Sequence, residues 1–147
     1  MKNFTVKKIL TFLVLVAICF SSVAVLTSCG KDGKTNSAIK VDVDVMASPN
    51  EMAAFNKTND INRYPDDYEG KTVRIKGSFS RTTLNGGSKK HNFIDVYDGC
   101  CSWTWVTFTW SGDLPDSGKT VTVIGTVHTA KENGNKFAEI TAEKLEF

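Results

Sequence analysis

The chain of 147 residues carries little net charge and only four cysteines and three prolines. Its 18 basic and 16 acidic side chains give a formal charge of +2. Three of the basic residues stand within the first eight positions: Lys2, Lys7 and Lys8. Residues 29–147 therefore hold 15 basic against 16 acidic side chains, about −1. A nearly neutral domain lacks the positive surface that binding to a nucleic-acid phosphate backbone requires, so no nucleic-acid partner is expected.

Motifs for catalysis are also missing. There is no Gly-x-Ser-x-Gly nucleophile elbow and no glycine-rich phosphate loop. The carboxylates are scattered, and His91 stands nine residues before Cys100, one whole strand away. A thiol nucleophile needs a base within hydrogen-bond reach. These absences predict that the protein is not an enzyme.

The N-terminus carries the clearest motif. An apolar stretch from Ile9 to Leu26 follows the basic start and ends in Leu26-Thr27-Ser28-Cys29-Gly30. This segment resembles the lipobox of bacterial lipoproteins. The resemblance implies that residues 1–28 are a cleaved signal peptide and that Cys29 is lipidated, anchoring the protein to a bacterial cell membrane on its extracytoplasmic face. The alternative is a signal anchor that happens to end in cysteine.

The remaining sequence predicts a short polar tether, residues 29–40, and one domain, residues 41–147. Ile39 to Val45 alternates like a half-exposed strand, and Ser48-Pro49-Asn50-Glu51 predicts a helix capped by Ser48 with Pro49 at its first position, fraying near Thr58. Tyr64 to Gly70 is a turn-forming approach. Five strands are expected after it: Thr72–Leu84, His91–Tyr97, Trp103–Trp110, Lys119–Ala130 and Lys136–Phe147.

Two of these strands begin with nearly the same sequence. Gly70-Lys71-Thr72-Val73-Arg74-Ile75-Lys76-Gly77 is echoed by Gly118-Lys119-Thr120-Val121-Thr122-Val123-Ile124-Gly125. A glycine inside a long alternating strand marks a bend or bulge, which a small closed barrel needs. The fold expected is all-β with one short helix.

The repeated Gly-Lys-x-Val pattern resembles the OB-fold, a five-stranded Greek-key barrel. More narrowly, the stretch from Tyr64 through Cys100-Cys101 to Val121 is similar to a group of uncharacterised bacterial lipoproteins. It also resembles the C-terminal domain of a permease-associated membrane protein family of unknown function. Both carry adjacent cysteines after the second strand of the barrel, and the match covers about Val41 to Phe147. No established activity comes with it.

Cys100 and Cys101 are the two cysteines left in the domain, because Cys19 and Cys29 belong to the N-terminal segment. Adjacent residues cannot staple distant segments, so no disulfide scaffold is expected. Three interpretations of the pair stay open: an inert pair with one thiol buried, a vicinal disulfide, or a soft-metal site, with zinc as the implied cofactor and Asp98 as the nearest further ligand. The resemblance favours the last two.

Aromatic residues crowd the second and third strands. Trp103 and Trp105 share one side of their strand, and Val106, Phe108 and Trp110 share the other. If the second set fills the barrel, Trp103, Trp105 and Tyr97 form a ligand-binding shelf of the kind OB-folds use. Alternatively the shelf packs under the Ser48–Lys57 helix as a second small core.

These observations predict a lipid-anchored ligand- or protein-binding module of the cell envelope. Its partner would be an envelope transport complex or a small ligand. The alternative is a metal-handling or redox lipoprotein that uses the Cys100-Cys101 pair.

Overall fold

A computed structural model describes residues 39–84 and 86–147. The predicted signal peptide, Cys29 and residues 30–38 of the predicted tether lie outside the described residues, as does Asn85 in the predicted turn after the first long strand. The elements in chain order are β1 (Val43–Asp44), α2 (Glu51–Arg63), α3 (Pro65–Tyr68), β2 (Thr72–Thr83), β3 (Lys90–Tyr97), β4 (Trp103–Thr109), β5 (Thr120–Glu132) and β6 (Asn135–Glu146). No helix within this part of the chain is long and apolar enough to cross a membrane.

The two echoed segments of the sequence pair with each other. Thr72 to Ser78 of β2 runs antiparallel to Thr120 to Thr126 of β5, with Val73 opposite Gly125 and Gly77 opposite Val121. Ser78 pairs with both β5 and β3, and past it β2 leaves β5 and continues along β3. The ladder between β5 and β6 shifts register between Ile124 and Gly125, which is a β-bulge. The bends predicted from the two mid-strand glycines are therefore confirmed.

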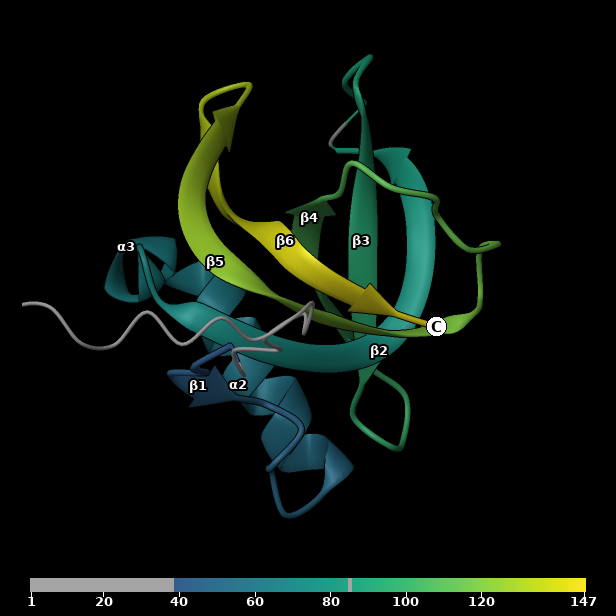
Figure 1. The fold of residues 1–147 in the computed structure, drawn as a ribbon. Helices are drawn as coiled ribbons and strands as arrows, with labels where there is room; N and C mark the ends of the chain where they lie inside the picture. Colours follow the sequence, from purple (N-terminus) through teal and green to yellow (C-terminus); the bar gives the residue numbers. More distant parts are fainter. Residues whose placement is uncertain (1–38, 85) are drawn as a thin grey trace, which may run out of the picture. The chain divides into compact units, whose positions relative to one another are not determined.

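These bends close the sheet. The order of hydrogen-bonded strands is β2-β3-β4-β6-β5, and β5 returns to β2 (Figure 1). Strands β4 and β6 pair in parallel, and the other pairs of the ring are antiparallel. The predicted all-β, five-stranded, OB-fold-like barrel is confirmed.

The alternating residues of the strands fill the barrel. Val106 is fully buried and Phe108 is 2% exposed, as expected for the inward set of β4, and Trp110 packs partly buried against the same core. The core takes further valines and isoleucines from β2, β3, β5 and β6: Val73, Ile75, Ile94, Val121, Val123, Val127 and Ile140. Burial of these apolar faces is the main force that holds the barrel together.

The helical region differs from the sequence prediction at both ends. Asn50, not Ser48, caps α2, because its side chain accepts a hydrogen bond from the Ala53 N–H at 2.8 Å. Pro49 therefore precedes the cap, and a residue before proline is held away from helical geometry. The helix does not fray near Thr58 but runs to Arg63, since Ile61 is fully buried in the barrel core.

Two further predictions are corrected. The domain carries two helices, not one, since Pro65 opens the one-turn helix α3 inside the predicted turn. The first strand is only two residues long and pairs in parallel with β2 at Val73 and Arg74. An ion pair between Asp44 and Arg74 fixes this strand to the barrel wall.

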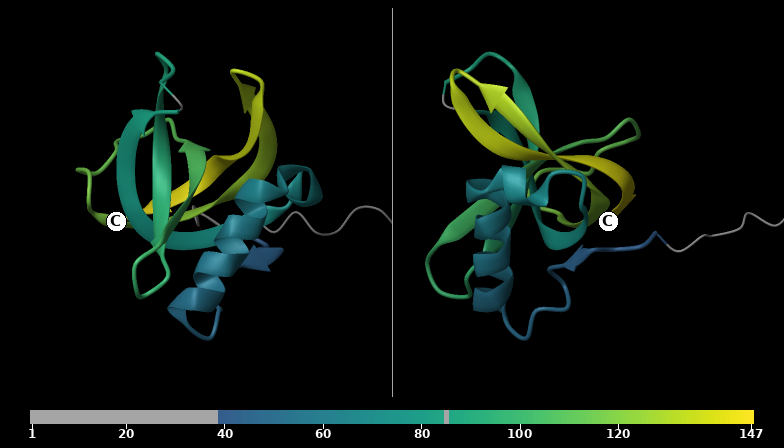
Figure 2. Two further views of the ribbon diagram at one scale, coloured as in Figure 1. Left: turned by 180° about the vertical axis from the view of Figure 1, so that it is seen from behind. Right: turned by 90° about the vertical axis from the view of Figure 1, so that its left-hand side faces the viewer.

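The two ends of the barrel present different loops. The β2–β3 connection and the β5–β6 hairpin project together at one end, and the turn between β3 and β4 projects at the other (Figure 1). Helix α2 packs against β3, β4 and β6, and its first residues lie at the end that carries the β3–β4 turn (Figure 2). This arrangement puts the cysteine pair beside the start of α2.

Candidate functional site

The outer face of β3 and β4 carries the aromatic residues that the sequence pattern singled out. Tyr97 stands directly opposite Trp103, and Asp95 stands opposite Trp105. The rings of Tyr97 and Trp103 lie 4.9 Å apart. Trp103 is 62% exposed, a large apolar side chain left in solvent. An aromatic pair is therefore displayed on the surface of the barrel.

Trp105 has a different environment from Trp103. It is half-buried and packs edge-to-face on Phe93, with ring centres 5.3 Å apart. Phe93, Leu84 and Phe137 form a second apolar cluster, and Trp105 packs against it. The predicted shelf is thus divided: Trp103 is exposed, and Trp105 joins a second small core. That core is built from β2, β3 and β6, not from the Ser48–Lys57 helix that the sequence suggested.

An open cleft of about 650 Å³ lies beside Trp103 and Tyr97. It runs between the start of α2, the middle of β2 and the end of β3, and Val45, Ala54 and Val96 contribute apolar surface. Asp95 also lines the cleft. Aromatic and aliphatic walls with a small number of polar groups are the usual composition of a small-ligand site.

Asp95 is the polar group of the cleft with the most unusual environment. Burial raises the pKa of its carboxyl, and a hydrogen bond from the Ser80 hydroxyl at 2.6 Å opposes that rise. Within residues 39–84 and 86–147 this carboxylate forms no ion pair with a basic side chain. A half-buried carboxylate without a cation is costly to ionise.

The charges around the cleft favour a cation. Glu51 and Asp95 supply two carboxylates, and Lys76 supplies one ammonium group. Aromatic faces such as that of Trp103 attract positive charge through the ring quadrupole. The cleft therefore combines two features, aromatic rings and surplus negative charge, that stabilise an organic cation.

The cysteine turn lies next to this cleft. Asp98 Oδ1 accepts hydrogen bonds from three successive backbone N–H groups, those of Cys100, Cys101 and Ser102, at 2.8, 2.9 and 3.0 Å. The hydrogen bond from Ser102 and those from the two cysteines hold the pKa of Asp98 below its usual value. The Tyr97 hydroxyl donates to the Cys100 carbonyl. Asp98 thus fixes the shape of the turn.

Both thiols of this turn are free and exposed. A hydrogen bond with the Cys101 thiol raises the pKa of the Cys100 thiol, and partial desolvation and the charge of Asp98 act in the same direction. A Cβ at Gly99 would meet the carboxylate end of Glu51, and the φ of 85° at this bend also suits glycine. The predicted metal ligands Cys100, Cys101 and Asp98 lie in one turn, but within the described residues they do not form a group arranged to hold a metal, and Asp98 Oδ1 is taken up by the backbone.

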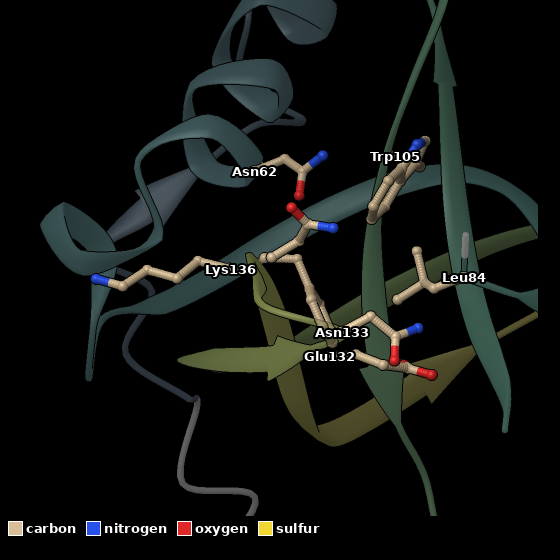
Figure 3. Close-up of a pocket in the computed structure, with 8 residues that line it drawn as sticks. Asn62, Leu84, Trp105, Glu132, Asn133 and Lys136 are labelled. Atoms are coloured by element: carbon tan, nitrogen blue, oxygen red, sulfur yellow. The ribbon is translucent and has the colours of Figure 1, made fainter. Parts of the chain in front are cut away.

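A second, smaller pocket of about 180 Å³ lies beside Trp105 (Figure 3). Trp105 lines it, together with Asn62 of α2 and residues of the β5–β6 hairpin. Trp103 and Trp105 therefore open into two separate hollows, which share no lining residue.

Sequence reasoning missed Asp95 and Asn62. Asp95 lies on the same side of β3 as Phe93 and Tyr97, so this spacing places its carboxylate on the aromatic face. Asn62 lies beyond the predicted end of the helix, and no sequence signal places it in the pocket that Trp105 lines.

No protein-family model matches this chain, and a search of curated proteins finds no match either.

Proposed function

We propose that this protein is a lipid-anchored, extracytoplasmic binding module of the bacterial envelope, and that its cleft beside Trp103 binds a small organic cation. The sequence around Cys29 supports the anchor, since it combines a basic start, an apolar segment and a lipobox-like end. The cleft supports the binding role. The uncharacterised lipoprotein family that the sequence resembles suggests no activity that conflicts with it.

The exposed Trp103, whose ring lies tilted against that of Tyr97, is the observation that carries the proposal. Folding gains little from an indole that is 62% exposed, so its position next to a cleft is better explained by a ligand. The carboxylate of Asp95 favours a ligand of positive charge. A bound cation would offset the cost of ionising this half-buried carboxylate, and Trp103 would add a cation–π contact.

The test compares two probes of the same shape, choline and its uncharged analogue 3,3-dimethyl-1-butanol. The full chain is kept in a polyoxyethylene detergent, which contains neither a sugar nor a quaternary ammonium group. The sequence has three tryptophans, so ¹⁵N-labelling of their indoles gives three resonances to follow. We expect choline to shift the Trp103 indole and the alcohol to leave it unchanged.

Variants then locate the site. Trp103→Ala should weaken choline binding about tenfold. Met52→Ala is the matched control, because Met52 is also exposed, at 47%, but does not line the cleft. Equal shifts with both probes would contradict a cationic ligand. No shift with either probe would contradict binding in this cleft.

The cysteine pair supports a second function, in thiol redox chemistry or soft-metal handling. The favouring observation is that two adjacent free thiols are exposed on a turn held by Asp98. Zinc takes four ligands in structural sites. Among residues 39–84 and 86–147 no group of three or more His, Cys, Asp or Glu side chains is arranged to hold a metal. The donors present suit an ion that accepts two thiolates better than they suit zinc.

Thiol titration of the protein with and without reductant, combined with metal analysis, tests this second function. A stoichiometric bound metal, or two thiols that titrate only after reduction, would support it. Two free thiols and no metal in protein taken from its native membrane would contradict it.

A further inference from the structure

The pocket beside Trp105 has a chemistry of its own, distinct from that of the cleft beside Trp103. It lies between the β5–β6 hairpin, the end of β2, β4 and the last turn of α2 (Figure 3). Trp105, Leu84 and Phe137 give it apolar walls, and three amides face it, those of Asn62, Asn133 and Asn135.

Each of the two charged residues of this pocket bonds to a side chain outside it. Lys136 Nζ lies 2.5 Å from Asp66 Oδ2, and Figure 3 shows its ammonium group directed away from the pocket. Glu132 Oε2 lies 2.6 Å from His91 Nε2, and the His91 side chain is only 3% exposed. A charged ligand would have to compete with these pairs. The pocket is therefore suited to a ligand without charge.

One polar atom of the pocket wall has no partner. Asn62 Oδ1 is buried and accepts no hydrogen bond. An amide oxygen has two lone pairs, and leaving a buried acceptor unsatisfied is unfavourable. The Asn62 side chain points into the hollow from α2 (Figure 3). A hydroxyl or N–H group of a ligand in the pocket would satisfy this oxygen.

We propose that this pocket binds one ring of a neutral carbohydrate. A sugar ring offers apolar C–H faces, which pack on aromatic walls such as Trp105, and hydroxyl groups, which both donate to and accept from amides. It carries no charge that would disturb the Lys136–Asp66 or His91–Glu132 pairs. The pocket shares no lining residue with the cleft beside Trp103, so a failure of sugar binding here would not contradict cation binding there, and the reverse also holds.

The experiment uses four probes of one ring size: glucose and N-acetylglucosamine, which are neutral, glucosamine, which is cationic, and glucuronate, which is anionic. The full chain is again kept in polyoxyethylene detergent, since alkyl glycosides would occupy a sugar site. The Trp105 indole resonance should shift with the two neutral sugars, and the Trp103 resonance should not. The two charged sugars should bind about tenfold more weakly or not at all.

Asn62→Ala should weaken binding of the neutral sugars about tenfold. Asn59→Ala is the matched control on the same helix, because Asn59 hydrogen-bonds Thr104 and does not line the pocket. Trp105→Phe is a second variant that retains an aromatic ring against Phe93, and it should also bind more weakly. The far-ultraviolet circular dichroism of each variant confirms folding.

Four results would overturn the proposal. The Trp105 resonance would stay unchanged with both neutral sugars, or the charged sugars would bind as well as the neutral ones, or folded Asn62→Ala would bind like the parent protein. A shift of the Trp103 resonance instead of the Trp105 resonance would place the sugar in the cleft beside Trp103 and would also contradict the proposal.

Discussion

Truncation of Trp103 to alanine is expected to remove the aromatic wall of the cleft while destabilising the fold by about 2 kcal/mol at most. A tryptophan that is fully enclosed buries roughly 250 Å². Trp103 is 62% exposed, so only about 90 Å² of it is covered. At about 25 cal/mol per Å² this area is worth about 2 kcal/mol, which is an upper limit because the unfolded chain also covers some surface.

Phe108 provides the contrast on the same strand. Its ring is 2% exposed and lies in the barrel core against Phe79, with ring centres 6.0 Å apart. Phe108→Ala should therefore cost about 3–5 kcal/mol, the usual range for a buried aromatic residue. The two truncations should differ clearly in their effect on the free energy of unfolding.

Urea denaturation followed by circular dichroism measures both variants under the same conditions. We expect the midpoint of Trp103→Ala to fall clearly less than that of Phe108→Ala. If Trp103→Ala unfolds as readily as Phe108→Ala, Trp103 is a structural residue, and the argument from its exposure to a ligand is wrong.

Three more predictions follow from the strand geometry and the two titrating groups. Gly125→Ala should destabilise the barrel by about 1–3 kcal/mol in thermal unfolding, because a Cβ there would overlap the backbone of Thr141 at the bulge, and an unchanged melting temperature would refute this. Burial raises the pKa of the Asp95 carboxyl above its value in the unfolded chain, so the folded protein loses stability as the pH rises through the folded pKa. Asp95→Asn should therefore have a larger free energy of unfolding than the parent at neutral pH, and the two free energies should become equal in acid. Cys101→Ala removes the hydrogen bond that raises the pKa of Cys100, so the pH midpoint of Cys100 alkylation should fall, and an unchanged midpoint would contradict the contact between the thiols.

The barrel could be predicted because its signals are local. Alternation along β2 and β5 places Val73, Ile75, Val121 and Val123 inward without knowledge of the partner strand. Gly125 likewise marks its bulge from within its own strand. The similar sequences of residues 70–77 and 118–125 also predict two strands of the same pattern, and these two strands pair with each other in the barrel.

The site could be predicted only in part, because its chemistry depends on contacts between distant segments. Trp103 and Trp105 have the same spacing signal, yet only Trp105 is half-buried, because it packs against the cluster that contains Leu84 and Phe137 from distant segments. Asp98 was expected as a metal ligand, but it is occupied by the backbone of its own turn. The length of α2 was underestimated for a similar reason, since packing of its last turns into the barrel outweighs their weak local helix preference.

The intact mass of the protein purified from its native membrane tests the central claim, that a lipid anchor presents this barrel outside the cytosol. We expect a chain without residues 1–28 that carries acyl groups on Cys29, and an unprocessed, unacylated precursor for Cys29→Ser. A parent protein that retains residues 1–28 and carries no fatty acid would contradict it.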